Sequence, residues 1–119
     1  IRTLWREARA VVVGVGAPFR GRKSIASVVP SGDAGLMGAV GDICLHFYDA
    51  DGRPIEFEGS ERLIRPERAL LEQIESSIAV AAGLEKAPSL IAGAKAGLFR
   101  TLITDTGTAA AVLDLLETS

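Results

Sequence analysis

Residues 11–18, which read VVVGVGAP, constrain the fold of this chain more than any other stretch. The three consecutive valines favour an extended backbone and pack poorly in a helix. Because the run is apolar without alternation, it predicts a parallel strand that is covered on both faces. Gly14, Gly16 and Ala17 then leave the backbone bare, and Pro18 ends any hydrogen-bond ladder. Ligands of open α/β sheets lie beyond the carboxyl ends of the strands, so this strand end is a candidate ligand floor.

Composition limits the class of protein. The 119 residues fit one domain or part of one, and 48% of them are hydrophobic, which is enough for a core. A net charge of −2 and 5% aromatic residues argue against a nucleic-acid-binding surface in this part of the protein. The single cysteine rules out an internal disulfide framework and predicts a cytoplasmic location. We expect no contact with a membrane, because the sequence has neither a signal peptide nor an apolar run of ~20 residues.

Hydrophobic periodicity predicts an open α/β fold, with a mostly parallel Rossmann-like sheet and one inserted β-hairpin. The alternation over residues 42–48 predicts one strand, and residues 49–52 predict a turn to a second strand at 54–57. Two strand–helix units follow, at 77–96 and 102–117, and imply parallel strands joined by right-handed crossovers. Helices are also predicted at 1–9, 34–39 and 67–76, with a short strand at 62–64.

The glycine-rich strand end does not match a dinucleotide-binding fingerprint. Phe19 stands where the fingerprint requires its third glycine, and Pro18 would lie in the crossing helix. We therefore expect no nicotinamide or flavin cofactor. Two interpretations of Gly14 and Gly16 stay open: a tight turn, or a loop that lets a sugar or phosphate approach the bare backbone.

Basic residues follow two of the predicted strand ends. Arg22 and Lys23 lie in a loop that is either solvated surface or a grip for an anion, since guanidinium groups suit phosphate. Gly83 ends the strand at 77–82, and Lys86 opens the next helix, where backbone amides favour an anion. Lys86 is otherwise a simple exposed lysine. Asp105 or Thr106 after the last strand is expected to cap the final helix.

Asp42, Cys44 and His46 share one face of the strand predicted over 42–48. Residues two apart on a strand are roughly 7 Å apart, which is too far for a direct hydrogen bond between a nucleophile and a base. The sequence has no second cluster of His or Cys to complete a metal site, so we expect no metal and no catalytic residues. Asp42 differs from the other two because it follows Gly41 at the mouth of the strand, where a carboxylate can meet sugar hydroxyls.

Three segments in order carry a resemblance to a known family: LWREARAVVVGVGAP, AVGDICLHFYDADGRPI and SIAVAAGLEKAPSLIAGAKAGLFRTLITDTGTA. Together they resemble the C-terminal sugar-binding domain of SorC-type bacterial transcriptional regulators. The resemblance implies a fold similar to ribose-5-phosphate isomerase and glucosamine-6-phosphate deaminase, a domain that senses a sugar or sugar phosphate without turnover, and assembly as a homodimer or homotetramer. It also implies that DNA is bound only through an N-terminal helix-turn-helix domain.

Carried over by position, the resemblance places the effector at Gly14, Gly16, Asp42 and Lys86, with Arg22 or Lys23 from the basic loop. The whole stretch 1–119 is then expected to be the C-terminal part of an effector domain. Neither the helix-turn-helix domain nor the first part of the effector domain is included. The sequence begins with Ile1 rather than Met, which fits a fragment.

Two other functions stay open at this point. A sugar-phosphate isomerase or deaminase of related fold would need a base near neutral pH, for which His46 and Asp42 are the candidates in this part of the protein. A structural module could instead pair an exposed strand edge with another copy.

Overall fold

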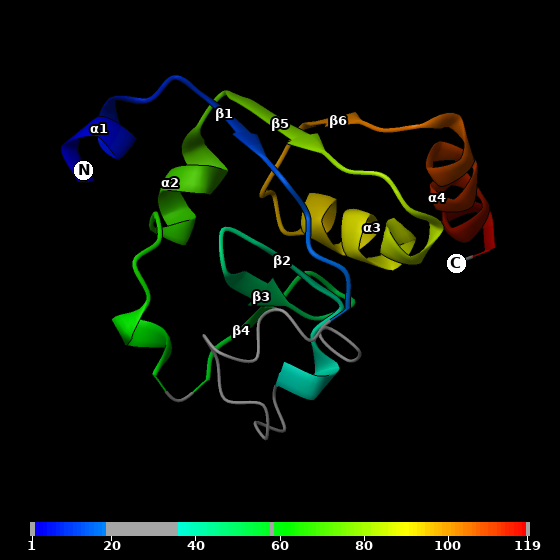
Figure 1. The fold of residues 1–119 in the computed structure, drawn as a ribbon, viewed down its shortest axis with the longest axis horizontal. Helices are drawn as coiled ribbons and strands as arrows, with labels where there is room; N and C mark the ends of the chain where they lie inside the picture. Colours follow the sequence, from blue (N-terminus) through cyan, green and yellow to red (C-terminus); the bar gives the residue numbers. More distant parts are fainter. Residues whose placement is uncertain (1, 19–35, 58, 119) are drawn as a thin grey trace.

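The computed structural model describes residues 2–18, 36–57 and 59–118, and their fold is α/β (Figure 1). Within these residues, one parallel sheet has the strand order β1-β5-β6 and one antiparallel sheet has the order β2-β3-β4. The elements in chain order are α1 (Arg2–Glu7), β1 (Ala10–Val13), η1 (Leu36–Gly38), β2 (Gly41–Ile43), β3 (His46–Tyr48), β4 (Pro54–Ile55), η2 (Ser60–Arg62), α2 (Arg68–Gln73), β5 (Ser76–Val80), η3 (Leu84–Lys86), α3 (Ala87–Lys95), β6 (Thr101–Ile103) and α4 (Thr106–Thr118), where η denotes a 3-10 helix.

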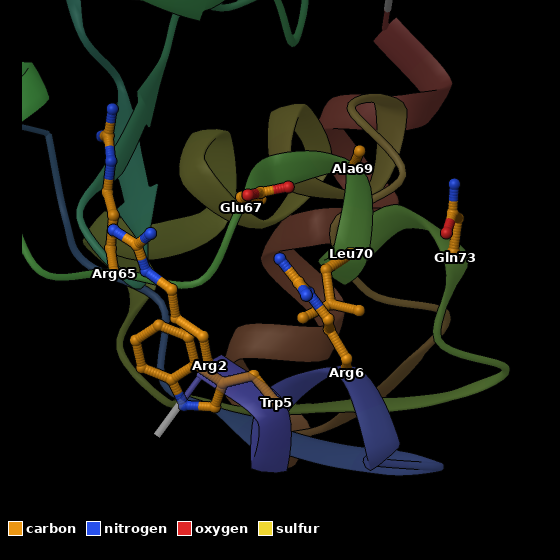
Figure 2. Close-up of a pocket in the computed structure, with 8 residues that line it drawn as sticks. All are labelled: Arg2, Trp5, Arg6, Arg65, Glu67, Ala69, Leu70 and Gln73. Carbon is orange, nitrogen blue, oxygen red and sulfur yellow. The ribbon is translucent and has the colours of Figure 1, made fainter.

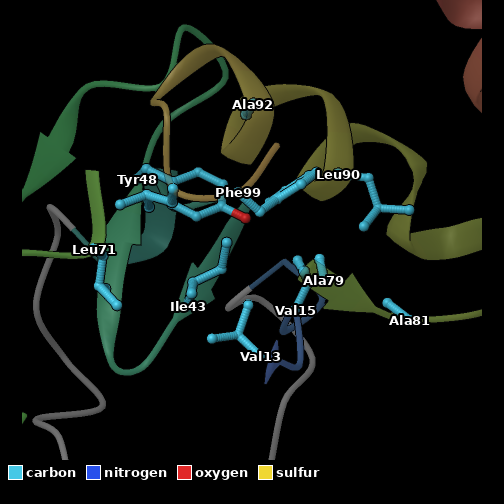
Figure 3. Packing of buried hydrophobic residues seen from close by; sticks show 11 residues of the cluster. Val13, Val15, Ile43, Tyr48, Leu71, Ala79, Ala81, Leu90, Ala92 and Phe99 are labelled. Atoms are coloured by element: carbon cyan, nitrogen blue, oxygen red, sulfur yellow. The ribbon is translucent and has the colours of Figure 1, made fainter. Parts of the chain in front are cut away.

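The parallel sheet confirms the strand–helix units predicted from the sequence. Val13 of β1 pairs with Ala79 of β5, and Val80 of β5 pairs with Ile103 of β6, all in parallel. α3 connects β5 to β6, and α4 follows β6. The buried face of the sheet packs against α3 and the antiparallel sheet in a core that includes Val13, Ala79 and Leu90 (Figure 3).

The prediction that the strand in residues 11–18 is covered on both faces is wrong for the described residues, and its neighbours in the sheet are open on the same face. The side chains of Val12, Val80 and Ile103 point to the face away from the core and are 67%, 47% and 54% exposed. The reason is topological. The strand order β1-β5-β6 advances in one direction, and right-handed crossovers in one direction place their connecting segments on the same face.

The hairpin differs most from the prediction, because residues 42–48 form two strands rather than one. Cys44 and Leu45 have φ values of 51° and 65°, so both central residues of the turn between β2 and β3 have positive φ, as in a type I′ turn. Gly41 pairs with Tyr48, and the predicted turn at 49–52 then leads into β4, as expected. The hairpin therefore forms its own sheet instead of an insertion in the parallel sheet.

Distant residues hold the unpredicted turn. Arg65 Nη1 donates a hydrogen bond to the Leu45 carbonyl at 2.7 Å, and His46 Nε2 lies 2.6 Å from the Pro66 carbonyl, to which it donates. Left-handed backbone is unfavourable for a residue with a side chain, at about 1–2 kcal/mol. The local sequence lacks the Asn or Gly that normally signals such a turn, so these long-range contacts stabilise it.

Smaller differences concern element ends. The helix predicted at 67–76 ends earlier, because Ile74 is buried with extended backbone and Ser76 already belongs to β5. The strand predicted at 62–64 is wrong, since η2 occupies Ser60–Arg62. In the helix predicted at 34–39, residues 36–39 are described, and they form only the 3-10 helix η1 at Leu36–Gly38. Across the described ranges, no helix combines the length and apolarity that a bilayer crossing needs.

Candidate functional site

The carboxyl ends of β1, β5 and β6 meet at one edge of the parallel sheet. Gly14 directly follows β1, Gly83 lies three residues beyond β5, and Asp105 lies two residues beyond β6. Because the three strands are parallel and paired in sequence, Gly14 and Gly83 lie at the same edge of the sheet. Ligands of open α/β sheets bind at this edge.

Asp42 is brought to this edge by a backbone bridge. The Gly16 N–H donates to the Asp42 carbonyl at 2.9 Å, and the two residues form an isolated antiparallel bridge between the two sheets. The Asp42 side chain is 7% exposed, so the carboxylate is nearly buried. The two residues predicted as ligands from separate segments are therefore direct neighbours.

Gly41 places Asp42 against the start of α3. A Cβ atom at position 41 would lie 2.7 Å from Ser89 Cβ, 2.8 Å from the Gly16 carbonyl oxygen and 2.9 Å from the Tyr48 hydroxyl. The Tyr48 hydroxyl donates to the Ser89 carbonyl at 2.8 Å, and the Ser89 hydroxyl donates to the Val40 carbonyl. Only a glycine fits this close approach between β2 and α3.

Sequence reasoning missed Gly41, Tyr48 and Ser89 as residues that position the site. Burial, followed by the negative charge of Asp42, raises the pKa of the Tyr48 hydroxyl, which therefore remains a donor. The glycine directly before Asp42 was the only local signal, because Ser89 and Tyr48 lie 41 residues apart in the chain.

Gly83 and Lys86 form the other side of this edge. Gly83 has a φ of +133°, and its N–H donates to Thr108 Oγ1 at 2.8 Å. This amide is therefore already hydrogen-bonded to a side chain of α4. A Cβ at position 83 would lie 2.5 Å from a carboxylate oxygen of Glu85, which covers the glycine. Lys86 is half-buried, directly precedes α3, and has no ion pair with any residue in the described ranges.

Of the two residues predicted to cap α4, Asp105 and Thr106, Asp105 has this role. Its Oδ1 accepts a hydrogen bond from the Thr108 N–H at 2.7 Å. This backbone hydrogen bond, followed by one from the Thr108 side chain, lowers the pKa of Asp105. Thr108 thus links the tip of β5 to the start of α4, and the Asp105 carboxylate has a structural partner.

Asp42, Cys44 and His46 do not share one strand face, because the turn at Cys44 separates them. Burial, with a smaller effect of the Asp42 charge, raises the pKa of the Cys44 thiol. Burial lowers the pKa of His46, and the neighbouring Arg65 and Arg68 cations act in the same direction. Within the residues that the structure describes, no group of three potential ligands could hold a metal ion.

The arrangement is a corner where β1, β2 and α3 meet. Gly16 contacts Asp42, Gly41 contacts Ser89 in the first turn of α3, and Lys86 lies just before that turn. Arg22 and Lys23, also predicted as ligands, lie outside the described residues. The fold and this corner define an α/β domain of the class that binds small molecules at its strand ends.

Comparisons with known proteins identify the family. A family model described as "Putative sugar-binding domain" matches residues 1–114. The chain belongs to this family of sugar-binding domains. The chain is 39% identical over 80 residues to the transcriptional regulator LsrR of Escherichia coli K12. The aligned residues cover 66% of this chain and 25% of the regulator. It is 28% identical over 123 aligned positions to the sorbitol operon regulator of Klebsiella pneumoniae. This alignment covers 95% of this chain and 37% of the regulator.

Solved structures are similar over nearly the whole chain. The full-length sorbitol operon regulator SorC from Klebsiella pneumoniae matches with a TM-score of 0.84 and 29% identity, over 95% of this chain and 37% of that protein. A transcriptional regulator from Streptococcus pneumoniae TIGR4 matches with a TM-score of 0.83 and 30% identity, over 97% of this chain and 45% of that protein. The chain thus spans less than half the length of each of these relatives.

Proposed function

We propose that this chain is the effector-sensing part of a sugar-responsive transcriptional regulator and binds a sugar or sugar phosphate at the corner of β1, β2 and α3. Asp42 accepts hydrogen bonds from sugar hydroxyls. Gly14 and Gly16 let the ligand approach the backbone, Gly83 does so once the Glu85 side chain that covers it turns away, and Lys86 offsets the charge of a phosphate. Arg22 or Lys23 adds a second cation for an anionic effector.

The observation that carries this proposal is the Gly16–Asp42 bridge beside the start of α3, in a chain of the sugar-binding family. A carboxylate next to bare backbone suits a ligand with many hydroxyls, because a hydroxyl can donate to the carboxylate while the missing side chains leave room for the sugar ring. Gly83 supports the site through its shape alone, since its N–H is already bonded to Thr108 and its carbonyl accepts a hydrogen bond from the Lys86 N–H.

The remaining protein supplies the other parts of the regulator. In this proposal an N-terminal helix-turn-helix domain binds the operator, the first part of the effector domain covers the open face of the parallel sheet, and the cytoplasmic protein is a homodimer or homotetramer. Apolar residues on that face, including Val12 and Val80, favour such a cover, because parallel sheets are normally buried on both faces. Effector binding shifts the population of domain arrangements by binding one of them more tightly.

We propose binding without turnover. His46, the base that an isomerase or deaminase of this fold would need, hydrogen-bonds to the Pro66 carbonyl through Nε2 in the hairpin. The enzyme alternative predicts product formation from a sugar phosphate by the full-length protein, and loss of product formation in Asp42→Ala. Turnover with that dependence would replace the sensor proposal.

Thermal-shift assays of the full-length protein test the sensor proposal against pentoses, hexoses, polyols and their phosphates. A true effector raises the melting temperature with increasing concentration. Asp42→Asn is expected to reduce the shift for any effector, and Lys86→Gln to reduce it most for a phosphorylated one. Lys95→Gln, an exposed lysine at the other end of α3, is the matched control. Equal shifts in all three variants would contradict the assigned site.

A further inference from the structure

A cavity lies between α1 and α2, away from the corner described above. Its volume is about 340 Å³, and its walls include Arg2, Trp5 and Arg6 of α1 together with Arg65, Glu67 and Leu70 near α2. Figure 2 shows the Arg6 side chain extending from α1 toward Leu70 of α2 and the Arg2 side chain extending toward Arg65. An adjoining cavity of about 510 Å³ shares Arg6 and Leu70 and adds Arg9. The size is within the range of small-molecule sites.

This cavity lies at the opposite edge of the parallel sheet from the proposed effector corner. α1 precedes β1 and α2 precedes β5, and these two strands are parallel. Residues that lead into parallel strands lie at the amino edge, whereas Gly14 and Gly83 lie at the carboxyl edge. In Figure 1, α1 and α2 accordingly lie at one side of the sheet and α4 at the other. Nothing in the proposed sugar site requires the residues of this cavity.

The charges around the cavity are unbalanced. Arg2 and Arg6 are one helical turn apart on α1, both are exposed, and neither guanidinium group makes an ion pair or hydrogen bond with any residue of the described ranges. Arg65 adds a third guanidinium, which is fixed by its bonds to the Leu45 carbonyl and to Glu56. Glu67 is the one carboxylate on the cavity wall. Like charges at this helical spacing destabilise a helix, so an anion between them would stabilise α1.

We propose that this cavity binds a small ligand carrying two oxyanion groups, either phosphates or carboxylates. The guanidinium groups of Arg2 and Arg6 each present a planar fork that binds an oxyanion through two hydrogen bonds. Their Cβ atoms are separated by roughly 5–6 Å at this spacing, which suits a ligand with two adjacent anionic groups. Trp5 and Leu70 give the ligand an apolar wall, and Glu67 accepts from a hydroxyl or ammonium group of the ligand.

Trp5 provides a direct assay because it lies on the wall of the cavity. We would titrate the protein with pyrophosphate and with citrate at constant ionic strength and follow tryptophan fluorescence. Saturable quenching or enhancement is expected with at least one of them, and the comparison distinguishes phosphate from carboxylate ligands. Sodium sulfate serves as the single-oxyanion control and is expected to bind at least tenfold more weakly, because it engages one fork instead of two.

Charge-matched variants test the assignment to these arginines. The double variant Arg2→Gln/Arg6→Gln is expected to weaken binding by about tenfold or more. Arg53→Gln/Arg62→Gln removes two charges from exposed positions elsewhere and is expected to leave the affinity unchanged. Arg2→Lys/Arg6→Lys keeps both charges but loses the forks, so intermediate binding is expected. Far-UV circular dichroism confirms that each variant is folded.

Three results would overturn the proposal. The first is a fluorescence change that depends on ionic strength and does not saturate, and the second is an affinity for sulfate equal to that for pyrophosphate and citrate. The third is that Arg53→Gln/Arg62→Gln weakens binding as much as Arg2→Gln/Arg6→Gln. Asp42→Asn separates this proposal from the effector site. That variant is expected to lose the thermal shift with sugars while its tryptophan titration stays unchanged, so each proposal can fail without the other.

Discussion

Gly41→Ala tests the close packing that places Asp42 at the corner. The added methyl group would lie within 3 Å of Ser89 Cβ, the Gly16 carbonyl oxygen and the Tyr48 hydroxyl. One of these atoms is backbone, and Tyr48 is fully buried, so the neighbours cannot simply rotate away. We expect β2 to move away from α3 and the corner to open.

The cost follows from the contacts. Overpacking a buried site costs about 1–3 kcal/mol. Movement of Ser89 also strains its hydrogen bonds to Tyr48 and Val40, each of which contributes about 1 kcal/mol. The free energy of unfolding should therefore fall by about 2–4 kcal/mol, which lowers Tm by roughly 10 °C in a domain of this size. Effector affinity should fall with it, because Asp42 follows Gly41 directly.

Urea denaturation followed by circular dichroism measures the change in the free energy of unfolding. Gly38→Ala is the matched control, since a Cβ there meets nothing within 4 Å, and it should be neutral or slightly stabilising. Gly93→Ala should lie between them, because its new Cβ would contact Tyr48 and Phe99 at 2.9 and 3.0 Å while alanine favours the helix. If the free energies of unfolding of Gly41→Ala and Gly38→Ala differ by less than about 0.5 kcal/mol, the packing argument is wrong.

Three further changes test separate contacts. Tyr48→Phe removes the hydroxyl that donates to Ser89, and should lower the free energy of unfolding by about 1 kcal/mol in urea titrations. His46 has a lowered pKa in the fold, so the unfolded chain binds more protons and stability should fall as the pH drops below about 6.5. His46→Gln should remove this part of the pH dependence, and a histidine NMR titration that gives an unshifted or raised pKa would contradict it. Asp105→Ala removes the cap of α4 and should lower the urea midpoint at neutral pH, with a smaller loss for Asp105→Asn, which keeps an acceptor. Because the pKa of Asp105 is lowered, the difference between Asp105→Ala and the parent should disappear as the pH falls through the folded pKa.

Much of the parallel sheet could be predicted because its signals are local. Three valines followed by glycines predict β1 and its end, and the repeated strand–helix spacing predicts β5, α3, β6 and α4. The cover of the open face could not be predicted in the same way. Continuous apolar residues indicate that a strand can be buried on both faces, but Val12 and Val80 stay exposed because nothing in the described chain packs over them.

The hairpin shows where local reasoning fails. Ile43, Leu45 and Phe47 alternate as a strand does, yet the chain reverses at Cys44 and Leu45 against their ordinary backbone preference. A turn that lacks its usual residues is decided by tertiary contacts, here the bonds from Arg65 and to the Pro66 carbonyl. Those partners lie about twenty residues away, and no window of local sequence contains both sides.

This dependence extends to the candidate site. Asp42 could be selected from its place after a glycine, but its position depends on the turn that follows it. Arg65 and Pro66 hold β3 at one end, Tyr48 holds it against Ser89 at the other, and β3 in turn pairs with β2. The Gly16 bridge then joins β2 to the continuation of β1. In the proposed site, a ligand bound to the Asp42 carboxylate therefore acts on a hairpin that is fixed at both ends, which would restrict the movement of the carboxylate and pre-organise it for binding.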